Sequence, residues 1–100
     1  MKALRLLAPN DLVLKEIEQT KLKPGWVRIS IKSVGICGSD LYSITGKLPF
    51  TKYPITPGHE FSGVITEINN TRKIKVGQAV TANPIFHCGL CSHCLEGNIH

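Results

Sequence analysis

The chain has 100 residues, of which 42% are hydrophobic and 19% are charged, a composition typical of one globular domain and not of a disordered segment. The formal net charge is +5, but the twelve lysines and arginines are scattered before Val76, so we expect a solvated basic surface and no nucleic-acid partner. No stretch approaches the roughly 20 apolar residues that cross a bilayer, and the first residues do not resemble a secretory signal. We therefore expect no membrane partner and a cytoplasmic location, where closely spaced cysteines bind metal more often than they form disulfides.

The first third of the chain predicts strands. Residues 3–7 and 12–18 are short apolar-rich runs on either side of Pro9 and Asn10, which favour a turn, so we expect a hairpin. In residues 26–34 hydrophobic and polar side chains alternate, which is typical of a half-buried strand.

A short helix is expected within residues 35–46. Ser39 and Asp40 favour helix starts, and Gly46 can end a helix in the left-handed conformation. Capping of this helix is one role open to Ser39.

The second half of the chain is less regular. Residues 48–57 contain three prolines and predict an irregular loop, whereas residues 61–68 and 79–82 favour strands. From Pro84 onward no apolar periodicity remains, so this last segment needs something other than a hydrophobic core to hold it. We predict a mostly β fold with one short helix and a final lobe held by metal.

The final segment contains three cysteines, each separated from the next by two residues: Cys88, Cys91 and Cys94. This spacing lets one loop supply three corners of a tetrahedral zinc site. An iron–sulfur cluster is the less favoured alternative, because Asn98 stands where the bacterial pattern has its fourth cysteine. The fourth zinc ligand is left open among His87, His93, His100 and a residue beyond the chain.

A second candidate site involves Cys37 and His59. Cys37 lies just before the expected helix, where the helix dipole favours a thiolate. His59 and Glu60 follow Pro57 and Gly58, and consecutive residues of a strand point to opposite faces, so both could reach one metal only if this turn bends the backbone.

Three motifs in this order resemble the zinc-containing medium-chain dehydrogenases, and within them the polyol, threonine and sugar-alcohol branch. The motifs are GICGSD at 35–40, PGHE at 57–60 and CxxCxxC at 88–94. The resemblance covers essentially the whole chain. It implies a GroES-like, partly open barrel with one short helix and a zinc-binding loop lobe.

The resemblance also implies a role for each site residue. Cys37 and His59 hold a catalytic zinc, and Glu60 is a ligand or a close neighbour of it. Ser39 passes the substrate proton toward solvent, and Asp40 orients the histidine. The structural zinc is held by Cys88, Cys91, Cys94 and a fourth cysteine beyond His100.

By this resemblance, residues 1–100 are the N-terminal part of the GroES-like catalytic domain of a dehydrogenase that oxidises a secondary alcohol, polyol or sugar alcohol with NAD or NADP. The dinucleotide-binding domain lies outside the chain, which has no G-x-G-x-x-G motif. The parent enzyme is expected to be a homodimer or homotetramer, and the fragment alone inactive. Tyr42 departs from the family, since many alcohol dehydrogenases have a proton-relay histidine there. The alternative is a non-catalytic, zinc-stapled binding module.

Overall fold

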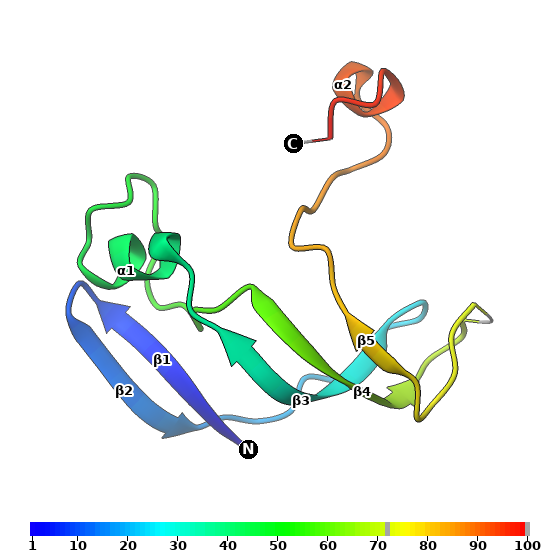
Figure 1. The fold of residues 1–100 in the computed structure, drawn as a ribbon, viewed down its shortest axis with the longest axis horizontal. Helices are drawn as coiled ribbons and strands as arrows, with labels where there is room; N and C mark the ends of the chain where they lie inside the picture. The colour runs from blue at the N-terminus through cyan, green and yellow to red at the C-terminus, as the bar shows by residue number, and fades with distance from the viewer. Residues whose placement is uncertain (72, 100) are drawn as a thin grey trace.

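The computed structural model describes residues 1–71 and 73–99. In this part of the chain, five strands form two antiparallel sheets, accompanied by two short helices (Figure 1). The elements are β1 (Lys2–Ala8), β2 (Asp11–Glu16), β3 (Val27–Gly35), α1 (Gly38–Ile44), β4 (Glu60–Ile68), β5 (Ala79–Thr81) and α2 (Ser92–Leu95). The prediction of a mostly β fold is confirmed.

The first two strands form the expected hairpin. β1 pairs with β2 in antiparallel register, with Leu6 opposite Leu12. The turn between them contains Asn10 at a φ of 61°, a left-handed conformation that asparagine tolerates better than most residues. The turn signal in the sequence therefore corresponds to a real local requirement of the backbone.

The second sheet has β4 in the middle, with β3 and β5 on either side. In the antiparallel pairing of β3 with β4, Gly35 at the end of β3 lies opposite Glu60 at the start of β4. Residues that follow β3 and residues that precede β4 therefore leave the sheet at the same end. This register is what brings Cys37 and His59 together, although they are far apart in the sequence.

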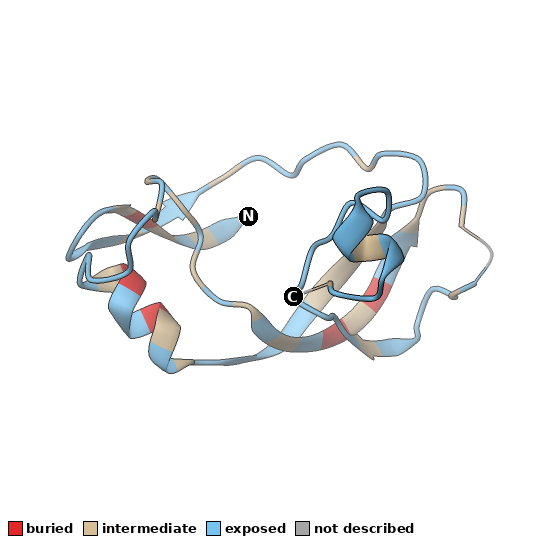
Figure 2. Cartoon of the chain, turned by 90° about the horizontal axis from the view of Figure 1, so that it is seen from above, coloured by how far each residue is buried: buried red, intermediate tan, exposed pale blue. Residues whose placement is uncertain are grey.

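The hydrophobic core is small. Among the described residues, Leu6 and Ile65 are the buried hydrophobic side chains, with exposed fractions of 0% and 1%. Leu6 exchanges two backbone hydrogen bonds with Ile55, of 2.9 and 3.0 Å, which join the hairpin to the loop after α1. Figure 2 shows how few positions are buried and that the sheets do not close around one centre. The expected barrel is thus open in the described part of the chain.

The expected short helix is α1, but the prediction of a single helix was wrong. A second helix, α2, forms in the final lobe, which follows β5 and lies apart from both sheets in Figure 1. It has only four residues, and one turn is too short to show the 3.6-residue periodicity on which sequence-based prediction depends. No helix of the described residues is long and apolar enough to cross a membrane.

Candidate metal centres

Cys37 occupies the N-cap of α1. Its backbone is extended, with φ −86° and ψ 157°, and its N–H donates to Asp40 Oδ2 at 2.9 Å. Asp40 sits in the first turn and is only 8% exposed. Cys37 was expected just before the helix, and it is the N-cap. The alternative role of Ser39 as N-cap is excluded, because the chain enters the helix two residues earlier and the carboxylate of Asp40 satisfies the N-cap N–H.

His59 reaches the same carboxylate from the other side. It follows Gly58, whose φ of 104° is a conformation that other residues rarely adopt, and it precedes β4 directly. His59 Nδ1 lies 3.4 Å from Asp40 Oδ1. One buried carboxylate therefore contacts the backbone of Cys37 through one oxygen and the ring of His59 through the other.

Glu60 completes a group of three side chains that could hold a metal ion. One ligand atom each from Cys37, His59 and Glu60 lie within 4.8 Å of one another. Zinc ligands at about 2.0–2.3 Å in tetrahedral geometry are roughly 3.3–3.8 Å apart, so a small closure would let all three bind one ion. The expected divergence of consecutive strand residues is avoided because His59 lies outside β4, after the bend at Gly58.

The titration of this group suits a metal site. The pKa of Cys37 is lowered, chiefly by a hydrogen bond from the Ser39 side chain, then by the Ser39 backbone and by His59, against opposing effects of burial and Glu60. The pKa of His59 is raised, chiefly by its hydrogen bond with Cys37, against an opposing effect of burial. The thiolate, which is the metal-binding form of cysteine, is thus favoured before any metal arrives.

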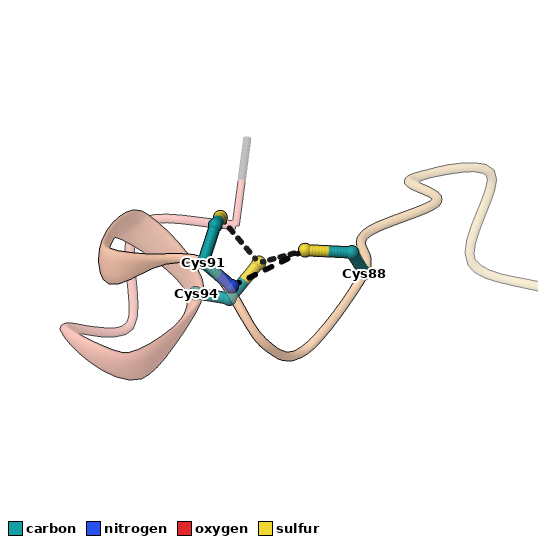
Figure 3. A group of neighbouring side chains, drawn as sticks. All are labelled: Cys88, Cys91 and Cys94. Carbon is teal, nitrogen blue, oxygen red and sulfur yellow. Dashed lines mark hydrogen bonds between the residues drawn. The ribbon is translucent and has the colours of Figure 1, made fainter.

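The second group lies in the final lobe (Figure 3). Cys94 Sγ is 3.7 Å from Cys88 Sγ and 3.4 Å from Cys91 Sγ, whereas thiolates bound to one tetrahedral zinc are about 3.8 Å apart. The N–H groups of Leu90 and Cys91 point at Cys88 Sγ, at 3.5 and 3.4 Å. These two contacts, Leu90 first, and the hydrogen bonds with the Cys91 and Cys94 side chains lower the pKa of Cys88 to about 7. The three sulfurs are close to the spacing that a zinc ion needs.

Of the histidines considered as a fourth ligand, His87 and His93 do not belong to the three-cysteine group that the described residues form. His100 lies outside the described residues.

Comparison with known proteins identifies the family. Residues 23–100 match the alcohol dehydrogenase GroES-like domain. The chain belongs to this family. It is 40% identical over 98 residues to the (R,R)-butanediol dehydrogenase of Bacillus subtilis, covering 86% of this chain and 28% of that protein. It is 36% identical over 99 residues to a zinc-type alcohol dehydrogenase-like protein of Haemophilus influenzae, covering 97% of this chain and 29% of the relative.

The fold agrees with that of a solved family member. The crystal structure of an alcohol dehydrogenase from Escherichia coli complexed with NADH matches 98% of this chain and 28% of its own, with a TM-score of 0.88 and 37% identity. The chain therefore spans less than a third of the length of the relatives that it matches.

Two features of this GroES-like domain were not found from the sequence. The Tyr53 hydroxyl donates to the backbone oxygen of Ser43 at 2.7 Å, which joins the loop after α1 to the last turn of that helix. Gly35 lies directly against Glu60 across the strand pair. An isolated glycine within a strand pattern is a signal of close approach, so Gly35 could have been singled out, whereas the Tyr53 contact has no sequence signal.

Proposed function

We propose that this chain is the metal-binding N-terminal part of the catalytic domain of a zinc-dependent, NAD(P)-linked dehydrogenase that oxidises an alcohol or polyol to the carbonyl compound. The observation that carries the proposal is the convergence of Cys37, His59 and Glu60 beside the buried carboxylate of Asp40. The H. influenzae relative is described as zinc-type and the E. coli structure contains NADH, which supports the choice of metal and cofactor.

The donor set fits zinc. One thiolate, one imidazole and one carboxylate are borderline ligands that zinc accepts in tetrahedral sites, and catalytic zinc sites commonly have three protein ligands and an open fourth position. When bound, zinc supplies a Lewis acid that lowers the pKa of a hydroxyl held beside it. Glu60 is exposed whereas Cys37 and His59 are half-buried, so Glu60 is the member of the set that a substrate can displace most easily.

Asp40 and Ser39 serve the ligands in different ways. Metal-binding histidines usually donate their second ring N–H to a carboxylate, which fixes the ring orientation and raises its basicity. Asp40 is suited to this because its Oδ1 lies 3.4 Å from His59 Nδ1. The Ser39 hydroxyl adjoins the thiol of Cys37, where it can take up the proton that a substrate hydroxyl releases. Tyr42 is exposed on the next turn and is the candidate for passing that proton to water.

The final lobe has a structural role in this proposal. Cys88, Cys91 and Cys94 hold a second zinc, whose fourth ligand comes from outside the described residues. The lobe has one half-buried cysteine and otherwise exposed residues from Pro84 to Asn98, so metal binding supplies the free energy that a hydrophobic core would supply elsewhere.

A non-catalytic zinc module explains only the final lobe. It leaves the Cys37 group and its orienting carboxylate without a role, and the family match to residues 23–100 favours the enzyme. The hydride acceptor site, the oligomeric assembly and the cytoplasmic location stay predictions for the whole protein.

The test is an activity assay on the complete protein that contains this chain. With NAD or NADP and a panel of secondary alcohols, diols and sugar alcohols, we expect reduction of the cofactor by at least one substrate. Cys37→Ser should abolish this activity. Leu14→Ser, at an exposed position of the outer strand β2, is the control and should leave the activity unchanged. A complete protein that holds zinc and oxidises none of the panel would contradict the proposal.

A further inference from the structure

Gly35 and Glu60 form the last residue pair of the β3–β4 ladder. In an ordinary antiparallel pair, the two Cβ atoms are about 4.5–5.5 Å apart. A Cβ built on Gly35 would lie only 3.1 Å from the Cβ of Glu60. The two strands therefore approach at this point more closely than two side chains would allow.

The carboxylate of Glu60 fills the space that a side chain at position 35 would need. A Cβ on Gly35 would lie 2.7 Å from Glu60 Oε2, which is well inside van der Waals contact. The same carboxylate has an oxygen within 4.8 Å of the ligand atoms of Cys37 and His59. Glu60 thus turns back over Gly35 in order to stand beside the other two ligands.

Glycine is not required at this position by the backbone, because Gly35 is not among the glycines with positive φ. Two contacts remain to explain its presence, and both are with Glu60: a side chain at position 35 would meet the Cβ of Glu60 and, more closely, its carboxylate. The neighbouring Gly38 differs in this respect, since a Cβ there would meet nothing within 4 Å.

We propose that Gly35 is a positioning residue of the metal centre: the missing side chain at 35 is what allows the Glu60 carboxylate to lie against β3 and face Cys37 and His59. This inference rests on the proposed function, because it assumes that the three residues hold a metal. A methyl group at position 35 pushes the carboxylate out of the group. We expect the fold to survive, because the tightest contact is with the free end of a flexible side chain and the 3.1 Å contact with the Glu60 Cβ requires the strands to part by only a few tenths of an ångström.

The experiment is cadmium NMR of the complete protein, in which the one-cysteine site and the three-cysteine site give separate resonances. Gly35→Ala and Glu60→Ala should shift the resonance of the one-cysteine site in the same direction, and each should raise its metal dissociation constant by about 10- to 100-fold, the usual cost of losing a group that supports a metal site. In the double variant the two effects should not add, because both remove the same carboxylate. Gly38→Ala, a glycine in open space, should leave the resonance in place.

Three results would overturn the inference. Gly35→Ala could leave the resonance and the affinity as in the wild type; its effect could persist undiminished in the Glu60→Ala background; or Gly38→Ala could reproduce it. If Gly35→Ala alone does not fold, the Gly35→Ala, Glu60→Ala double variant is tested next. A double variant that folds supports a clash between position 35 and the Glu60 carboxylate. If neither variant folds, the glycine is required by the backbone instead.

The same spectra separate this inference from the proposed function. A wild-type protein without any one-cysteine resonance contradicts the proposed function. A wild-type protein with that resonance, unchanged by Gly35→Ala, contradicts only the role of Gly35.

Discussion

Asp40 is the residue on which the geometry of the first metal centre depends. Asp40 is 8% exposed, and its carboxylate has one oxygen on the Cys37 N–H, at 2.9 Å, and the other 3.4 Å from His59 Nδ1. It therefore holds the start of α1 and the histidine in one arrangement. A side chain at this point that keeps only one of the two contacts would leave the other partner free to turn.

We predict that Asp40→Ala raises the dissociation constant of the metal at the Cys37 group by about 10- to 100-fold. Asp40→Asn should cost less, because its amide oxygen can still accept from Cys37. Competition with a chelator measures both constants. Equal affinities for the wild type and Asp40→Ala would show that His59 needs no orienting partner.

The titration of Cys88 gives a second prediction at this scale. In metal-free protein its pKa is about 7, chiefly because the Leu90 and Cys91 N–H groups stabilise the thiolate, with further lowering by the Cys91 and Cys94 side chains, against about 8.5 for an ordinary cysteine. Its alkylation rate should therefore rise as the pH increases through about 7 and level off above. Protons compete with metal below that pH, so metal affinity of the lobe should fall there.

The measurement is the rate of iodoacetamide labelling at Cys88, followed by mass spectrometry from low to high pH. Saturating zinc should suppress the labelling at every pH. A midpoint near the ordinary cysteine value would contradict the role of the Leu90 and Cys91 N–H groups.

At the level of elements, the β3–β4 ladder positions the first site. The alternation in residues 26–34 predicted β3, and the turn signal at Pro9 and Asn10 predicted the hairpin, because both depend on local sequence. The register that sets Gly35 opposite Glu60 was not predictable, since it depends on the pairing of two strands distant in the chain. The sequence therefore predicted the candidate ligands, which the structure brings close together, but not that the carboxylate of Glu60 folds back over β3.

For the helices too, some features were predicted from the local sequence and others were not. Cys37 was expected just before α1 and is its N-cap. The contact of the Asp40 carboxylate with the Cys37 N–H was not predicted, because the sequence does not show which backbone N–H a carboxylate accepts from. α2 was missed for lack of length. The metal-binding spacing of the cysteines needed no such detail, because it depends only on positions along the chain.

Gly63 tests the packing of the second sheet. A Cβ there would meet the backbone oxygen of Ser30 and would lie 2.6 Å from Ile29 Cγ2. Backbone cannot rotate away as a free side chain can, so Gly63→Ala should lower the free energy of unfolding by about 1–3 kcal/mol. Chemical denaturation of the complete protein measures the loss, with Gly38→Ala as the control. If Gly63→Ala lowers the free energy of unfolding no more than the control does, β3 and β4 can move apart without loss of stability.

At the scale of the whole molecule, the described residues combine a small hydrophobic core with two groups of side chains that could hold a metal ion. Leu6 and Ile65 are buried, whereas several large side chains are nearly free of contacts, among them Phe50 and Phe86, each 96% exposed. In the final lobe all residues except Cys94 and Ile99 are exposed, within the part of the lobe that the structure describes. In the proposed function its order depends on metal binding to the three cysteines, because packing contributes little.

The central claim is that one chain carries two zinc centres with separate ligands. The most direct test is the zinc content of the complete purified protein, measured by elemental analysis together with protein concentration. We predict two zinc ions per chain in the wild-type protein. The Cys37→Ser, His59→Ala double variant and the Cys88→Ser, Cys91→Ser double variant should each retain one. A single zinc ion in the wild-type protein that survives the Cys37 and His59 substitutions would contradict it.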